Sequence, residues 1–195
     1  MSGPQYNLPF RRRRSGRTNY RKRRRLVGSG SVRLVVRPSN KHIAAQIVRA
    51  QPFGDQVLAS AHSSELKEFG WKAPCGNLPA AYLTGLLAAR RARSSGVTDV
   101  VLDIGLHARD PGSRIFAVAK GAIDGGLHLP HDASTLPSKE RVEGEHVGNY
   151  AKNVASDGER YKRIFSGYLR QKLKPEELGD QFKQVEGKLR ATSGT

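Results

Sequence analysis

The chain has 195 residues, with 34 Lys and Arg against 17 Asp and Glu, so its formal net charge is +17 at pH 7. This length allows one domain with tails, or one domain with a small appendage. A free soluble protein rarely carries so much positive charge, because self-repulsion destabilises the compact state. The charge therefore predicts a polyanionic partner, which could be nucleic acid, an anionic membrane or an acidic protein. The chain contains no run of about 18 apolar residues, so we predict no membrane span. Cys75 is the only cysteine, which excludes an internal disulfide and indicates a reducing compartment.

Most of the positive charge lies near the start of the chain, in an arm that we assign to residues 1–30. Its first 25 residues contain ten basic side chains and no acidic one: Arg11, Arg12, Arg13, Arg14, Arg17, Arg21, Lys22, Arg23, Arg24 and Arg25. Such a block repels itself and predicts disorder in the free chain. The planar Arg fork holds phosphate and stacks on bases, and the interleaved Tyr6, Phe10 and Tyr20 could also stack on bases. These features favour an RNA-binding arm over a nuclear-localisation or solubility tail.

A folded domain is predicted over residues 31–130, after the flexible joint Gly28-Ser29-Gly30. Its first part contains three apolar, β-favouring segments separated by short turns. We predict strands at 32–37, 42–49 and 56–62. Three strands with such short connections predict an antiparallel meander.

The second half of this domain predicts a helix, a strand and a further helix. Asn77 is a suitable N-cap for a helix that Gly96 ends. The nearly all-apolar run 97–104 predicts a buried central strand. Ser113 is expected to cap the next helix, which ends at Gly125. The order β-β-β-α-β-α predicts an α/β fold with a mixed sheet and helices packed on it.

The remaining residues, 131–195, predict a helical C-terminal extension. One helix is expected over 138–154, and two apolar stripes at helical spacing follow. These stripes are Tyr161, Ile164, Phe165, Tyr168 and Leu169, and then Leu178, Phe182, Val185 and Leu189 after Pro175. The helices are too polar to form a separate core, so we expect them to pack on the main domain or on a partner.

A catalytic function would have to use the carboxylates around the 97–104 strand. Asp103-Ile104-Gly105 is similar to a phosphate loop of sugar kinases, and Asp99 and Asp103 share a strand face, as a two-metal nuclease requires. Neither site has the further loops or acidic residues that it needs. We therefore favour a structural interpretation, in which one Asp caps a loop and the other lies at the strand edge. We predict no catalytic set, no metal site and no cofactor.

The turn between the first two strands is the strongest candidate for specific recognition. It places Arg37, Ser39, Asn40, Lys41 and His42 within six residues at a hairpin tip. Such a tip can meet phosphates, 2′-hydroxyls and base edges together. An ordinary turn with solvated charges is the alternative, but the nearby arm favours RNA.

Several short segments together resemble one protein family. They are Gly3-Pro4…Arg11-Arg12-Arg13-Arg14, Arg17-Thr18-x-Tyr20, Ser39-Asn40-Lys41-His42-Ile43-x-Ala45-Gln46, Ala59-Ser60-Ala61-His62-Ser63, Gly76-Asn77-Leu78-Pro79-x-Ala81-Tyr82-Leu83, Leu102-Asp103-Ile104-Gly105 and Gly121-Ala122-Ile123-Asp124. In this order they resemble the large-subunit ribosomal protein that binds 5S rRNA, numbered eighteen in bacteria and archaea and five in eukaryotes. The archaeal form is the most similar. Each segment is weakly specific alone, whereas the ordered set is highly specific.

The resemblance implies an α/β fold, a cytoplasmic location in the ribosome, and no catalysis. It implies assembly into the central protuberance, with 5S rRNA, 23S rRNA and the neighbouring 5S rRNA-binding protein as partners. By residue match, Ser39, Asn40, Lys41 and His42 should approach 5S rRNA, as should Ser113 and Arg114 in the loop before the second helix. The arm would thread between rRNA segments. We expect it to supply affinity, while the folded domain selects the RNA.

Overall fold

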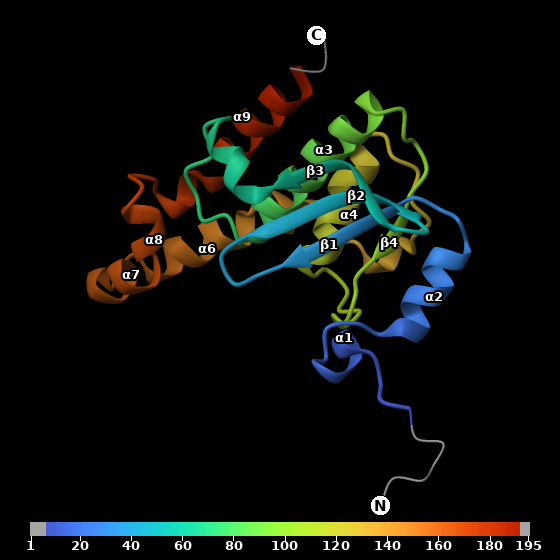
Figure 1. The fold of residues 1–195 in the computed structure, drawn as a ribbon. Coiled ribbons are helices and arrows are strands. Elements are labelled where there is room, and N and C mark those ends of the chain that lie inside the picture. Colours follow the sequence, from blue (N-terminus) through green and yellow to red (C-terminus); the bar gives the residue numbers. More distant parts are fainter. Residues whose placement is uncertain (1–6, 192–195) are drawn as a thin grey trace, which may run out of the picture.

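The computed structural model describes residues 7–191, so Gly3, Pro4 and Tyr6 lie outside the described range. Its centre is a mixed sheet in the order β3-β2-β1-β4, with helices α3 and α4 packed behind it (Figure 1). The strands are β1 (Arg33–Pro38), β2 (Ile43–Gln51), β3 (Gly54–His62) and β4 (Val101–Asp103). β1 is antiparallel to β2 and parallel to β4, and β2 is antiparallel to β3. The predicted α/β class and the antiparallel meander are confirmed.

The helices lie in three groups along the chain. The arm contains α1 (Arg11–Arg14) and α2 (Tyr20–Gly28), and the central domain contains α3 (Leu78–Ser94) and α4 (Arg114–Asp124). The C-terminal group is α5 (Lys139–Glu143), α6 (Glu145–Val154), α7 (Gly158–Ile164), α8 (Ser166–Leu169) and α9 (Leu178–Ala191). Short 3₁₀ turns occur at Ser63–Lys67, Ala133–Thr135 and Pro175–Glu177. Within residues 7–191, none of the helices has the length and apolar content that a bilayer span requires.

The prediction of a buried central strand over 97–104 is wrong in two respects. β4 has only three residues, and it lies at the edge of the sheet beside β1. Val97 and Val100 are nevertheless buried, because they pack into the core outside the ladder. An apolar run indicates only that a segment is buried. Here the packed helices bury a segment that lies at the edge of the sheet.

The arm contains two short helices, which the expectation of a disordered segment did not include. The side chain of Asn19 caps α2 by accepting a hydrogen bond from the backbone N–H of Lys22, at 3.2 Å. Arg23 forms an ion pair with Asp55, at the start of β3, across 2.9 Å. A helix cap and one neutralised charge thus offset part of the self-repulsion in this segment.

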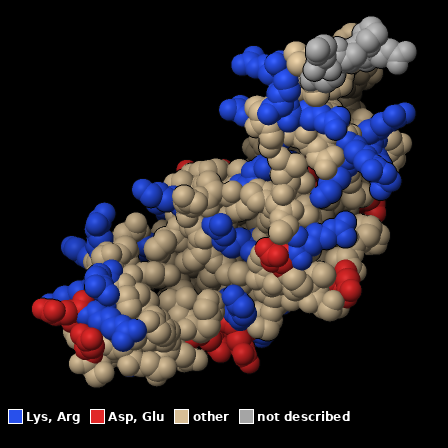
Figure 2. Space-filling view, turned by 90° about the horizontal axis from the view of Figure 1, so that it is seen from below, with Lys and Arg blue, Asp and Glu red and all other residues tan. Residues whose placement is uncertain are grey.

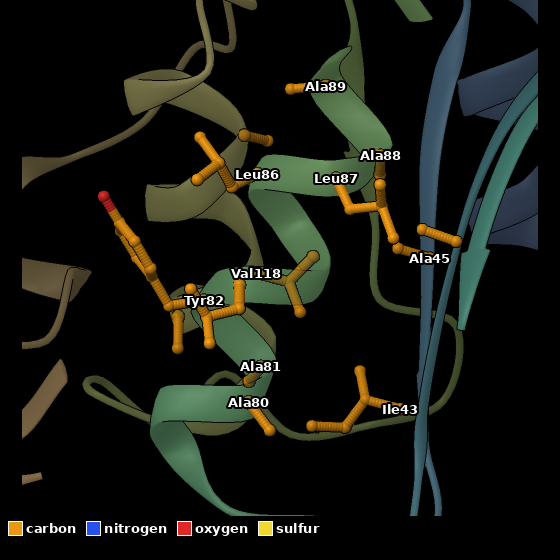
Figure 3. Close-up of a cluster of buried hydrophobic side chains, with 14 of the residues drawn as sticks. Ile43, Ala45, Ala80, Ala81, Tyr82, Leu86, Leu87, Ala88, Ala89 and Val118 are labelled. Carbon is orange, nitrogen blue, oxygen red and sulfur yellow. The ribbon is translucent and has the colours of Figure 1, made fainter. Parts of the chain in front are cut away.

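Helix α3 is buried along most of its length, because it lies between the sheet and α4. The Asn77 side chain caps it as predicted, accepting from the backbone N–H of Ala80 at 2.9 Å. Figure 3 shows Ile43 and Ala45 of β2 facing α3. On the opposite side, Tyr82 packs on Phe182 of α9, with ring centroids 5.5 Å apart. The helix therefore joins the sheet to the C-terminal helices.

The C-terminal helices pack on the main domain, as expected. Leu178, Phe182, Val185 and Leu189 of α9 are all buried in the same core as the sheet. The predicted single helix over 138–154 is interrupted at Gly144, which separates α5 from α6. The core is continuous across residue 130.

Two glycines allow α3 and α4 to cross in backbone contact. A Cβ atom on Gly85 would collide with the Val118 carbonyl oxygen, and one on Gly121 would collide with that of Tyr82. The distance between two packed helices depends on the side chains at their contact. Any larger residue at either position would force the layers apart.

We predict that Gly121→Ala lowers the free energy of unfolding by about 1–3 kcal/mol, the usual cost of overpacking. The matched control is Gly187→Ala, on an exposed stretch of α9 where no atom lies near the added Cβ. This control should gain about 0.5–1 kcal/mol, because Ala favours helix over Gly. Urea denaturation measures both. Equal stability of the two variants would contradict the close helix crossing.

Candidate nucleic-acid interface

The hairpin tip between β1 and β2 is closed by one serine. The Ser39 hydroxyl donates to the His42 carbonyl oxygen at 2.9 Å and accepts from the His42 N–H at 3.0 Å. The Ser39 backbone N–H also donates to this carbonyl, at 2.8 Å. Asn40 and Lys41 are exposed between these two residues. The turn therefore presents an amide and an ammonium group on a hydrogen-bonded frame.

Two other segments support the tip from below. The Arg114 Nη1 donates to the Ser39 carbonyl oxygen at 2.7 Å and to that of Gly76 at 3.1 Å. A Cβ atom on Gly76 would lie 2.8 Å from the Asn40 carbonyl oxygen, so only glycine fits beneath the turn. The structure thus brings together the two predicted sites, the tip and the loop before α4. Arg114 contributes mainly by holding the tip in place.

His42 at the end of the tip and Ser113 near it are less exposed than Asn40 and Lys41. Ser113 occupies the N-cap position of α4, yet its hydroxyl makes no capping hydrogen bond, contrary to expectation. Its Oγ is buried and has no hydrogen-bond partner within residues 7–191. The half-buried His42 ring lies 5.0 Å from that of His62, and its Nδ1 is 3.5 Å from the Ser63 Oγ. Asn40 and Lys41 are therefore the exposed candidates for recognition at the tip.

Arg37 was expected at the tip, but its guanidinium lies at the end of β4. Its Nη1 donates to the carbonyl oxygens of Val36 and Asp103, at 2.7 and 2.8 Å, and its Nη2 lies 3.3 Å from the Asp103 carboxylate. The side chain is still 44% exposed. Arg37 thus joins two strands and keeps one side open to solvent.

Arg33 is a structural residue of this region that the sequence did not reveal. It is only 1% exposed, and its guanidinium lies 3.0 Å from the Asp103 carboxylate and 2.9 Å from that of Asp55. Asp55 also forms an ion pair with Arg23 of the arm. Burial alone would raise the pKa of Asp55, but hydrogen bonds and charge from Arg33 and Arg23 outweigh it and lower that pKa. These pairs connect the arm to the sheet.

The two aspartates of the 97–104 segment have structural roles. Asp103 also accepts a hydrogen bond from the Gly105 N–H at 2.9 Å, which caps the loop after β4. Asp99 is exposed at the sheet edge, where it lies 3.1 Å from His128. The structural interpretation of both residues is confirmed.

The remaining arm residues form an exposed basic surface. Viewed from the arm side of the molecule, Lys and Arg side chains cover much of that end (Figure 2). The exposed arginines are Arg11, Arg12, Arg13, Arg14, Arg17, Arg21, Arg24 and Arg25. Tyr20 is half-buried, with its ring 5.1 Å from that of Phe10. The arm thus offers many cations and few neighbouring carboxylates.

Comparison with known families gives this basic surface a context. A family model described as ribosomal large subunit proteins 60S L5 and 50S L18 matches residues 4–99 and 92–132, which is more than half of the chain. The chain belongs to this family. It is therefore a structural protein of the large ribosomal subunit, with rRNA and ribosomal proteins as partners. The family is not enzymatic.

Arg114 provides a test of how the tip is held. We predict that Arg114→Gln increases amide hydrogen exchange at residues 39–42, because the Ser39 and Gly76 carbonyls lose their shared donor. Arg163→Gln on α7 removes one exposed charge elsewhere and should leave this exchange unchanged. Mass spectrometry of peptides spanning the tip measures the difference. Unchanged exchange in Arg114→Gln would show that the turn holds its shape alone.

Proposed function

We propose that this protein binds 5S rRNA and helps attach it to 23S rRNA in the central protuberance, beside the other 5S rRNA-binding protein. The observation that supports this most strongly is the supported hairpin tip. Asn40 and Lys41 are exposed, while Ser39, Gly76 and Arg114 hold the backbone beneath them. Family membership supports the same role.

A supported tip suits the recognition of structured RNA. The Asn40 amide can donate and accept hydrogen bonds at base edges or 2′-hydroxyls, and the Lys41 ammonium can pair with phosphate. Because the backbone is already ordered, binding costs little conformational entropy. Such contacts distinguish one RNA surface from another, which a flexible cation does not do.

The arm complements the tip through charge. Arginines on phosphates release counterions whatever the sequence, so they supply affinity with little discrimination. We accordingly retain three functional regions: the arm at 1–30, the selective domain at 31–130, and the extension at 131–195. The division concerns function alone, because Val142 and Phe182 share the core of the central domain.

We predict that the double substitution Asn40→Ala and Lys41→Ala lowers affinity for 5S rRNA about tenfold or more. A lost hydrogen bond to a charged group costs about 1.5–3 kcal/mol. Affinity for an unrelated structured RNA of similar length should fall much less. Competition binding with both RNAs measures the change in selectivity.

The matched control is Lys152→Ala with Asn153→Ala, an exposed pair of the same composition on α6. It should leave the preference for 5S rRNA intact. Equal losses on both RNAs in the tip variant would contradict the assignment of selectivity to the tip. An absence of any 5S rRNA preference in the unaltered protein would contradict the proposed function.

Replacing Arg11, Arg12, Arg13 and Arg14 with Gln should flatten the salt dependence of rRNA binding. If each contacts one phosphate, the slope of log K against log salt becomes less negative by roughly 3, because each contact contributes about 0.7–0.9. The control replaces four exposed basic residues of the C-terminal helices: Arg160, Lys162, Arg163 and Arg170. A smaller change in the arm variant than in this control would contradict phosphate binding by the arm.

A further inference from the structure

A hollow lies along the seam between the arm and the loop that follows β4. It encloses about 360 Å³, within the roughly 300–1,000 Å³ of small-ligand sites. Arg17, Lys22 and Arg25 of the arm line one side, and Leu106 and Arg109 of the loop line the other. Neither the arm nor the loop forms this hollow alone.

The charged residues that line this hollow are nearly all positive. Arg12, Arg23 and Arg37 also line it, and Asp103 is its acidic residue. The carboxylate of Asp103 already pairs with Arg33 and Arg37. Within residues 7–191, no acidic side chain pairs with Arg17, Lys22, Arg25 or Arg109. Unpaired cations around a concave surface concentrate anions there.

The hollow also has an apolar wall, which a simple phosphate site does not need. Leu26, Leu102, Ile104 and Leu106 contribute to the lining, and Leu106 is 51% exposed although it is a large apolar residue. Cations beside an aliphatic surface match the chemistry of a nucleotide, whose phosphate is anionic and whose base has an apolar face.

A second hollow adjoins the first at Leu106. It is lined by Arg13, Tyr20 and Arg21, and it shares Thr18, Asn19 and Leu106 with the first. The Tyr20 ring gives it a stacking surface. Two adjacent hollows, each lined by cations and by Leu106, suit successive nucleotides of an unpaired strand, because a duplex keeps its bases stacked inside.

We propose that this seam binds an unpaired segment of RNA, with a phosphate among Arg17, Arg25 and Arg109 and bases against Leu106 and Tyr20. The inference rests on the proposed function and adds that the RNA bound along the arm is unpaired. Arg109 and Leu106 are new recognition residues. The bound strand would contact both the arm and the domain, because residues of both line the hollow.

The test uses the full chain and a ten-residue oligouridylate, which has no stable secondary structure. Arg109→Gln should weaken its binding about five- to tenfold and make the salt slope less negative by about 0.7, the contribution of one phosphate on a single strand. Leu106→Ser should weaken binding with the slope unchanged, because it removes only the apolar contact. Arg163→Gln, which removes the same charge from exposed α7, should change neither measurement.

Two outcomes would overturn the inference. One is an Arg109→Gln variant that behaves like Arg163→Gln. The other is an RNA duplex of equal length that binds as tightly as the single strand and is weakened equally by Leu106→Ser. The competition assay with the Asn40 and Lys41 variant is independent of both. If the seam variants do not behave as expected but the protein still prefers 5S rRNA, only this inference is contradicted. If the unaltered protein shows no preference for 5S rRNA, the proposed function is contradicted.

Discussion

One buried guanidinium holds together the parts of the molecule that we propose face RNA. Arg33 at the start of β1 lies between Asp103, which ends β4, and Asp55, the second residue of β3. A buried charge without partners is strongly unfavourable, so the buried Arg33 guanidinium requires its carboxylate partners. Asp55 extends the network to Arg23 of the arm. The arm, the edge strand and the loop after it are therefore positioned by a single set of ion pairs.

Two kinds of basic residue look alike in the sequence but differ in their partners. Arg33, Arg37 and Arg114 are directed at carboxylates and carbonyl oxygens of the protein. The exposed arginines of the arm have few such partners and remain available for a polyanion. The first group builds the surface and the second supplies its charge. We propose that the ordered tip thereby acts beside a segment that contributes affinity.

Sequence periodicity and capping chemistry account for most of the fold. Apolar, β-favouring segments between short turns predicted β1 to β3, and Asn77 correctly marked the start of α3, because these signals are local. β4 was misplaced because an apolar run carries no information on whether a strand is central or at an edge. The break at Gly144 was missed because an isolated glycine within a helical segment does not by itself end the helix.

For the site, the sequence by itself determined the excess of cations, the turn at 38–41 and a family resemblance that the family model later matched. It also placed Ser39 to His42 and Arg114 in one candidate list. Only the tertiary structure showed that Arg114 lies beneath the tip, that Arg37 turns toward β4, and that Arg33 is buried. The same holds for the seam that joins the arm to Leu106 and Arg109. These facts depend on pairings between residues tens of positions apart, which the packing of the sheet and its loops decides.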